Sequence, residues 1–274
     1  MPELPEIETI KRTLTPLLLG RRILAVKLIK PVVAAYPAPE IFAARLEGAT
    51  VDNLGRRGKY LLCYLDSGDT LIAHLRMTGR FLYTPAGHPL KPHTHVVFAL
   101  DNGSELRFSD VRRFGRLWLI PAGEQDTVSG IQKLGPEPLS EACSAAYYRD
   151  RLAGRRISIK QGLLDQSVVA GLGNIYVDEA LFQAGLHPQR PVGEVSEEKW
   201  QALAQAIPHI LQKAIENNGT TFRDYLDGEG NAGRNLPHLN AYGRANQPCL
   251  KCGTTMERLV VAGRGTTFCP RCQQ

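Results

Sequence analysis

Two Cys-x-x-Cys pairs near the C-terminus constrain this chain more than any other feature. Cys249 and Cys252 form the first pair and, after sixteen intervening residues, Cys269 and Cys272 form the second. This spacing matches a four-thiolate zinc site, in which the pairs together supply a tetrahedron. A disulfide pair or a redox Cys-x-x-Cys is the alternative, but no feature of the sequence indicates secretion. We therefore predict a zinc ribbon with one structural zinc ion.

The segment between the two pairs predicts the shape of this ribbon. Residues 256–268 are typical of a β-hairpin that turns at residues 263–265, which would place Arg264 at its tip. The other two cysteines, Cys63 and Cys143, lie in apolar sequence and are expected to be inert buried thiols.

The second residue of the chain offers an unusual nucleophile. If the initiator methionine is removed, Pro2 carries a terminal secondary amine, which can attack an electrophilic sugar carbon and hold it as an iminium ion. An α-amino group titrates near pH ~8, against ~10.4 for a lysine side chain, so an appreciable fraction is unprotonated at neutral pH. Glu3 beside it is suited to acid–base work. The alternative is that Pro2 and Pro5 only stiffen a surface tail and start a helix.

The net charge favours a polyanionic partner. The chain has 33 Lys and Arg against 27 Asp and Glu, which gives a formal charge of +6. Basic residues cluster at 56–59, 112–116 and 155–156, although a solvated face is the alternative for any one cluster. The acidic, proline-rich start does not resemble a signal peptide, and no apolar run reaches the ~18 residues of a membrane span. We expect a cytoplasmic protein without membrane contact.

The spacing of apolar residues predicts a β-rich half followed by a helical half. A chain of 274 residues can bury a sizeable core and is expected to form more than one domain. After a helix at residues 5–19, short strands and turn sequences predict an antiparallel β-sandwich, with strands at 23–29, 59–65, 70–75, 81–84, 95–100, 105–109 and 116–120. Helices are predicted at residues 147–153, 163–169, 175–184 and 196–216.

A glycine turn lies between two of these helices. Gly-Leu-Gly-Asn at residues 171–174 leads into the helix that starts at Ile175, and backbone N–H groups at such a helix start point toward a potential phosphate. On these residues alone, the simpler interpretation is that Asn174 only caps its helix.

Taken together, six segments resemble the bacterial formamidopyrimidine-DNA glycosylases, also called 8-oxoguanine DNA glycosylases. They are Pro-Glu-Leu-Pro-Glu at 2–6, Gly-Lys-Tyr-Leu at 58–61, His-Leu-Arg-Met-Thr-Gly at 74–79, Asp-Val-Arg-Arg-Phe-Gly at 110–115, Gly-Leu-Gly-Asn-Ile-Tyr at 171–176 and the terminal cysteine motif. The resemblance spans essentially the whole chain.

This resemblance implies an α+β, multi-domain fold. It consists of an N-terminal antiparallel β-sandwich with flanking helices at residues 1–130, a linker at 131–140, a helix-two-turn-helix domain at 141–244 and a zinc-finger hairpin at 245–274. DNA would cross the cleft between the domains. The implied partner is double-stranded DNA that contains oxidised purines or abasic sites, and the implied state is a monomer.

The resemblance also implies a DNA repair reaction. Pro2 would attack C1′ of the damaged nucleotide, expel 8-oxoguanine or a formamidopyrimidine, and leave an enzyme-bound Schiff base. Elimination on both sides of the sugar then cuts the strand, so the enzyme is both a glycosylase and a lyase. Glu3 would move protons at the deoxyribose, Lys59 would contact the phosphate and lesion region, and Arg264 belongs to the same catalytic set. The alternative is that Lys59 is an ordinary exposed strand lysine.

Further residues match the family's DNA contacts. Because the reacting nucleotide must be flipped out of the duplex, other groups must fill the space it leaves. Met77, Arg112 and Phe114 match the void-filling residues, although on sequence alone Met77 and Phe114 would be assigned to the core.

Phosphate contacts are implied at five positions. Asn174 and Arg264 match the residues that hold the phosphates flanking the lesion, and His74, Lys160 and Tyr242 are weaker candidates for the same role.

Residues 220–242 correspond to the family's lesion-recognition loop, and glycines at 228, 230 and 233 give it the mobility that a closing lid needs. Two positions depart from the family pattern. Asn218 stands where glycine is expected, which is tolerable because Asn adopts left-handed backbone conformations. Asn235 stands where an aromatic residue is usual.

Two other functions remain open at this point. An endonuclease VIII-like enzyme would share the proline, the helix-two-turn-helix and the zinc finger but would prefer oxidised pyrimidines, and it would be expected to start Glu-Gly where this chain has Glu3-Leu4. A non-enzymatic zinc-ribbon DNA-binding protein is the second alternative, for which Pro2 and Glu3 would be incidental.

Overall fold

The computed structural model describes residues 2–274 and forms two compact units. Met1, whose removal would free the Pro2 amine, lies outside the described residues. The first unit comprises the chain up to Gln132 together with Asn217–Arg234. The second comprises Lys133–Glu216 and Asn235–Gln274.

Helix α1, Leu4–Leu18, carries the N-terminal residues of the first unit. It begins with a capping box, in which the Glu6 carboxylate accepts a 2.8 Å hydrogen bond from the backbone N–H of Glu3. Pro5 sits in the first turn, where a missing N–H costs nothing. The apolar stripe of the helix is buried in the core and consists of Ile7, Ile10, Leu14 and Leu18.

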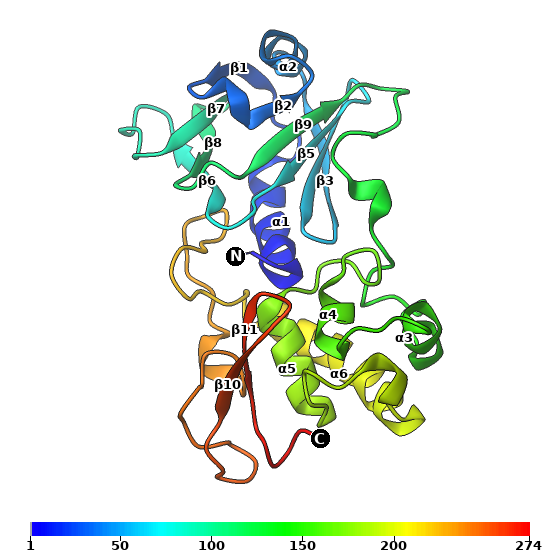
Figure 1. Ribbon diagram of the computed structural model, residues 1–274. Helices are drawn as coiled ribbons and strands as arrows, with labels where there is room; N and C mark the ends of the chain where they lie inside the picture. Colours follow the sequence, from blue (N-terminus) through cyan, green and yellow to red (C-terminus); the bar gives the residue numbers. More distant parts are fainter. Residues whose placement is uncertain (1) are drawn as a thin grey trace. The chain divides into compact units, whose positions relative to one another are not determined.

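Two sheets form the β-sandwich of this unit (Figure 1). One has the strand order β1-β7-β8-β6, and the other has the order β2-β9-β5-β4-β3. Their bounds are β1 Ile23–Leu28, β2 Ala34–Tyr36, β3 Val51–Arg57, β4 Tyr60–Leu65, β5 Thr70–His74, β6 Gly79–Pro85, β7 Thr94–Leu100, β8 Ser104–Asp110 and β9 Arg116–Ile120. Helix α1 contacts β3 and β4 in one sheet and β6 in the other, so both sheets anchor the N-terminal helix.

The sandwich differs from the predicted one in two respects. Strand β2 runs parallel to β9, so the sandwich is not wholly antiparallel. The elements β2, β3 and helix α2, Pro39–Leu46, were not predicted. In β3 only Val51 and Leu54 are buried, because the rest of the strand is polar or glycine and gives no apolar alternation.

The second unit is built from four α-helices and a hairpin (Figure 1). The helices are α3 Ala145–Leu152, α4 Ile159–Leu164, α5 Asn174–Ala184 and α6 Glu197–Glu216, and the hairpin strands are β10 Glu257–Val261 and β11 Arg264–Phe268. The predicted helix at 163–169 is wrong in position. Ser158 caps the start of α4 by accepting from the Gln161 N–H, and the helix ends at Leu164.

Short 3-10 helices complete the chain, at η1 Pro31–Val33, η2 Ile131–Lys133, η3 Val192–Glu194 and η4 Leu236–His238. The α+β fold with a β-sandwich, a helical domain and a cysteine-bearing hairpin is confirmed. Within residues 2–274, no helix has both the length and the apolar character needed to cross a membrane.

Residues 217–234 pack on the first unit, whereas the predicted domain limits group them with the helical domain. The backbone N–H of Gly228 donates to Thr13 Oγ1 at 3.1 Å, and the Gly228 carbonyl accepts from the Tyr83 N–H at 2.9 Å. This segment, which includes most of the predicted recognition loop, therefore bonds to α1 and to β6.

Candidate active site

The predicted nucleophile and its neighbouring carboxylate lie at the start of α1. Pro2 and Glu3 are both buried, and Glu3 is the N-cap of the helix. The positive end of the helix dipole lies at this end, so it favours negative charge there. A secondary amine and a carboxylate on consecutive residues suit nucleophilic attack coupled to proton transfer.

Glu6 connects this catalytic end to the segment at 217–234. One carboxylate oxygen accepts from the Glu3 N–H, and the other accepts from the Thr220 N–H at 2.8 Å. Tyr225 donates through its hydroxyl to the Asn218 carbonyl at 3.2 Å, and burial, followed by the negative charge of Glu6, raises the pKa of this phenol. Glu6 is 1% exposed, so water does not compete for these bonds.

Lys59 occupies the turn that joins β3 to β4. Arg57 and Tyr60 are the last paired residues of this hairpin, and Gly58 adopts a positive φ of 53° between them. Lys59 is only 7% exposed and lies in the turn, so the alternative of an ordinary exposed strand lysine is wrong.

His74 lies beside this turn at the end of β5. Its ring packs edge-on against Tyr60 with centroids 4.6 Å apart, and its Nδ1 accepts from the Arg76 N–H at 3.0 Å. Burial, followed by the positive charges of Arg76 and Lys59, lowers the pKa of His74 to about 3. The ring is therefore neutral near pH 7, and with Nδ1 accepting, Nε2 carries the proton and can act as a hydrogen-bond donor.

The three predicted void-filling residues meet on the surface of the first unit. Arg112 Nη1 lies 2.9 Å from the Met77 sulfur, and the Arg112 guanidinium lies 4.9 Å from the centroid of the Phe114 ring. Met77 is 37% exposed and Phe114 is 50% exposed, so the assignment of these two side chains to the core is wrong. The structure thus brings together a flexible apolar chain, a guanidinium and an aromatic ring.

Asp110 holds the loop that carries two of these residues. Its carboxylate accepts from the backbone N–H groups of Arg112 at 3.1 Å and Gly115 at 2.7 Å, and from the hydroxyl of Thr78. Arg113, between Arg112 and Phe114, has a positive φ of 58°. The loop is therefore fixed by a buried carboxylate and carries local backbone strain.

In the second unit, Asn174 and Arg264 lie on neighbouring elements. Asn174 is the first residue of α5, with Gly173 as the N-cap, and its Nδ2 donates to the Gly265 carbonyl at 2.8 Å. The side chain therefore binds the hairpin instead of capping its helix. Arg264 is exposed and directly precedes Gly265 in β11.

The hairpin turn differs from the predicted one. Val261 pairs with Arg264, so the two turn residues are Ala262 and Gly263, with φ of 49° and 71°. Positive φ at both positions is the geometry that a two-residue hairpin turn requires. Arg264 therefore flanks the turn as the first residue of β11 and is not its tip.

Lys160 is not an exposed donor. Its side chain is fully buried, and its ammonium donates to Asp178 at 2.5 Å and to Thr266 Oγ1 at 2.7 Å. Thr266 Oγ1 in turn donates to the Arg264 carbonyl at 3.1 Å. Lys160 is therefore linked to the backbone of Arg264 through one hydroxyl group.

Tyr242, the last phosphate-contact candidate, is half-buried. It ends a backbone segment that is held by a carboxylate. The Glu179 carboxylate accepts from the N–H groups of Asn240, Ala241 and Tyr242, each at 2.8 Å. This single side chain fixes the path of the chain into the finger.

The four predicted metal ligands form one cluster. The ligand atoms of Cys249, Cys252, Cys269 and Cys272 all lie within 4.8 Å of one another. The sulfur separations are 3.9 Å for Cys249 and Cys272 and 3.6 Å for Cys252 and Cys269, too long for a disulfide at about 2.05 Å. A tetrahedral zinc with bonds of about 2.3 Å places its sulfurs about 3.8 Å apart, so the cluster fits that ion.

Comparison with known protein families matches almost the whole chain. The N-terminal domain of formamidopyrimidine-DNA glycosylase matches residues 1–117, the H2TH domain of the same enzyme matches residues 134–225, and the zinc finger found in FPG and IleRS matches residues 246–274. The chain belongs to the formamidopyrimidine-DNA glycosylase family. The resemblance seen in the sequence motifs is thereby confirmed.

Individual members of the formamidopyrimidine-DNA glycosylase family are similar over their full length. The chain is 52% identical to the Moorella thermoacetica enzyme over 94% of both chains and 49% identical to the Geobacillus kaustophilus enzyme over 100% of both. Among solved structures, a Lactococcus lactis enzyme in complex with Fapy-dG DNA is 35% identical with a TM-score of 0.92 over 100% of both chains. The Thermus thermophilus enzyme is 41% identical with a TM-score of 0.89, covering 99% of this chain and 98% of that one.

Several residues that were not predicted support the candidate site. Glu6, Asp110, Asp178 and Glu179 each accept backbone or side-chain hydrogen bonds that hold a predicted site residue or its loop. For Glu6 a signal existed, because an acid three residues after the N-cap is the pattern of a capping box. Asp178 bonds to Lys160 in another helix and to the Thr267 N–H, and the partners of Glu179 lie more than sixty positions away, so local patterns could not identify these two carboxylates.

Proposed function

We propose that the chain is a bifunctional DNA repair enzyme, a glycosylase and AP lyase that excises oxidised purines from duplex DNA and cuts the strand. The observation that carries this proposal is Pro2, a terminal secondary amine once Met1 is removed, next to Glu3 at the start of α1. Relatives across the full length bear the name formamidopyrimidine-DNA glycosylase. The Lactococcus lactis relative is described in complexes with Fapy-dG DNA and with abasic-site DNA.

The chemistry needs only the amine and a proton carrier. The Pro2 nitrogen bonds to C1′ and gives up its proton, while the C1′–base bond breaks and the base leaves with the electron pair and takes up a proton. Breaking of C1′–O4′ then forms the iminium ion, and the ring oxygen takes up a proton. Loss of a proton from C2′ expels the 3′ phosphate, and a second elimination expels the 5′ phosphate. We assign the proton transfers at the sugar to Glu3.

DNA contacts are proposed on both units. In the first unit, Lys59 and the neutral His74 would bind the phosphate and lesion region, and the cluster of Met77, Arg112 and Phe114 would occupy the space of the flipped nucleotide. In the second unit, Asn174, Arg264 and Tyr242 would bind flanking phosphates. We assign Lys160 an indirect role, because it is buried and reaches the Arg264 backbone through Thr266.

One structural zinc ion is proposed at the four cysteines. Four thiolates complete a tetrahedral coordination sphere and leave no position for a reactive water, so the ion would fix the finger and take no part in the reaction. Since all proposed site residues come from one chain, we propose that the enzyme acts as a monomer.

Borohydride trapping tests the proposed function. The protein is incubated with duplexes that contain 8-oxoguanine, thymine glycol or no lesion, and the Schiff base is reduced to a stable adduct. We expect an adduct with the 8-oxoguanine duplex and strand cleavage without borohydride. A clear preference for thymine glycol would favour a pyrimidine-specific enzyme, and the Lactococcus lactis relative is also described with an oxidised pyrimidine. No adduct with any lesion would leave a DNA-binding protein without this activity.

A further inference from the structure

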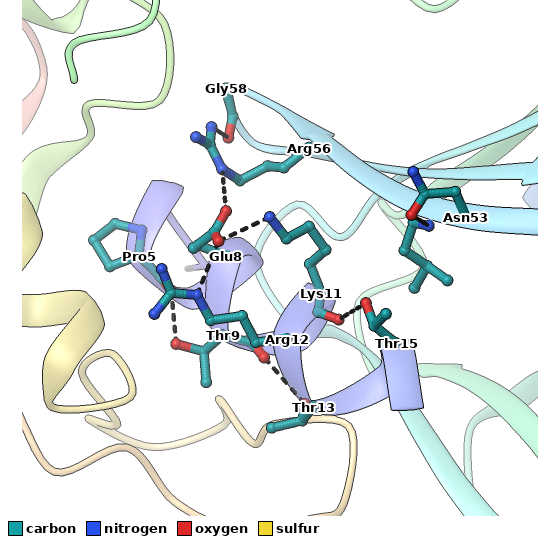
Figure 2. A network of polar contacts seen from close by, with 11 residues as sticks. Pro5, Glu8, Thr9, Lys11, Arg12, Thr13, Thr15, Asn53, Arg56 and Gly58 are labelled. Carbon is teal, nitrogen blue, oxygen red and sulfur yellow. Dashed lines mark hydrogen bonds and ion pairs between the residues drawn. The ribbon is translucent and has the colours of Figure 1, made fainter. Parts of the chain in front are cut away.

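Glu8 on α1 is surrounded by three cationic side chains (Figure 2). Its carboxylate accepts from Lys11 at 2.8 Å, Arg12 at 3.0 Å and Arg56 at 3.1 Å. Lys11 and Arg12 are three and four positions along the same helix, where such pairs stabilise the helix only slightly. Arg56 differs, because it comes from β3 and lies 48 positions away.

Arg56 makes a second bond, to the turn that carries Lys59. While its Nε donates to Glu8, its Nη1 donates to the Gly58 carbonyl at 3.1 Å. Figure 2 shows the guanidinium between the helix and the end of the hairpin. The side chains of Arg56 and Glu8 are both 10% exposed, so their pairing is shielded from solvent and from salt.

We propose that Glu8 and Arg56 are positioning residues for Lys59, an inference that rests on the proposed function. Glu8 belongs to the helix that starts beside Pro2 and Glu3, and Gly58 immediately precedes Lys59. The Glu8–Arg56–Gly58 connection therefore fixes the β3–β4 turn relative to the catalytic end of α1. We call this connection the Arg56 brace.

The sheet alone does not supply this constraint. The ladder from Val51–Leu65 to Arg57–Tyr60 fixes the register of β3 against β4, and Gly58 and Lys59 follow its last pair. The brace joins that turn to α1 through a side chain. Displacing a catalytic group by about 1 Å can cost up to about 10²-fold in rate, so a small movement of the turn matters.

The substitution Arg56→Lys distinguishes the two-bond brace from a simple ion pair with Glu8. Arg56→Lys keeps a cation beside Glu8, but an ammonium lacks the planar fork that holds a carboxylate and a carbonyl at fixed angles. Arg12→Gln is the matched control, since it removes a cation from Glu8 without touching Gly58.

The experiment measures single-turnover base excision, lesion-duplex affinity and thermal unfolding for these variants, each with Lys59 and with Lys59→Ala. We expect Arg56→Lys to slow excision about tenfold with little change in affinity, and Arg12→Gln to leave the rate unchanged. In the Lys59→Ala background, Arg56→Lys should have no further effect, because the group that it positions is absent. An equal loss in both backgrounds, or no loss in either, overturns the proposal and leaves Arg56 a stabilising residue.

Hydrogen–deuterium exchange separates failure of the brace from failure of the proposed function. Peptides that cover residues 57–60 should exchange at least about threefold faster in Arg56→Lys than in Arg12→Gln, because the turn has lost its tie to α1. Unchanged exchange overturns the brace whatever the activity. If the parent excises no lesion but the exchange differs, the brace holds the turn as stated and it is the repair function that fails.

Discussion

Glu6 accepts a 2.8 Å hydrogen bond from the backbone N–H of Thr220, although the two residues are 214 positions apart in the sequence. The same carboxylate accepts from the N–H of Glu3, next to the proposed nucleophile Pro2. A Cβ on Gly219 would approach Glu6 Oε1 to 2.9 Å, so the backbone passes very close to this side chain. One buried acid thus ties the 217–234 segment to the catalytic end of α1.

Replacing Glu6 with alanine should loosen this segment before it unfolds the protein. Without the carboxylate, the Thr220 N–H loses its buried acceptor, which costs about 1–3 kcal/mol locally. Hydrogen–deuterium exchange of residues 217–234 should rise more than exchange in the β-sandwich strands. A rise of equal size throughout the first unit would instead show global destabilisation.

Blocking the Pro2 amine should abolish both base excision and strand cleavage while lesion-duplex binding persists. Only a free terminal amine can form the Schiff base, whereas the proposed phosphate contacts are spread over many residues. The variant to test retains Met1, and its control is Pro2→Gly, which keeps a terminal amine and should retain part of the activity. Cleavage at the parent rate by a Met1-retaining protein would refute the assignment of Pro2.

Removal of the proposed zinc ion should unfold the finger and weaken DNA binding, while the sandwich that carries Pro2 stays folded. All four cysteines of the cluster belong to the second unit. Zinc binding at a structural site of this kind supplies much of the free energy that folds the hairpin around it. Arg264→Ala should reproduce most of the binding loss with zinc still bound. Bound zinc, affinity and trapping are measured together. Parent-like binding by Arg264→Ala would mean that the finger contributes through other residues.

Because of Glu8, the free energy of unfolding should depend on pH in the acid range. Burial alone would raise its pKa, but the hydrogen bonds from Lys11, Arg56 and Arg12 prevail and lower the pKa from 4.5 to about 2. Because the unfolded chain binds this proton more readily, the contribution of Glu8 is complete above about pH 4.5 and is lost as the pH falls toward about 2. The free energy of unfolding, measured with denaturant, should be higher for the parent than for Glu8→Gln above about pH 4.5. This difference should disappear as the pH falls toward about 2. If the difference in free energy of unfolding did not change with pH, the charge on Glu8 would not contribute to stability.

Sequence patterns predicted most strands of the sandwich because buried side chains there alternate or form apolar runs. Strands β4, β5, β7 and β8 lie within one residue of their predicted bounds. Helix α2 escaped prediction because its eight residues bury only Phe42 and Leu46, too few to show a helical period. Strand β3 escaped because its end is polar, and that polarity is explained by the bond from Arg56 to Glu8.

The candidate site was predicted less completely than the fold. Short motifs that resemble the family predict substrate contacts at positions such as Pro2 and Asn174, because the motifs have fixed local spacing. Motifs do not reveal burial, and Lys160 was therefore a candidate for a phosphate contact although it is enclosed by Asp178 and Thr266. Asp178 and Glu179 were missed because they accept hydrogen bonds from distant parts of the chain, which no local motif records.

Helix α5 bonds to the zinc finger and to the chain segment that leads into it. Asn174 bonds to the Gly265 carbonyl, Asp178 accepts from the Thr267 N–H at 3.2 Å, and Glu179 holds the backbone that leads into the finger. Residues that hold the finger in place therefore lie outside its sequence motif, so the motif alone is not a complete structural module. A protein engineer who wished to graft it onto another scaffold would have to carry α5 along with it.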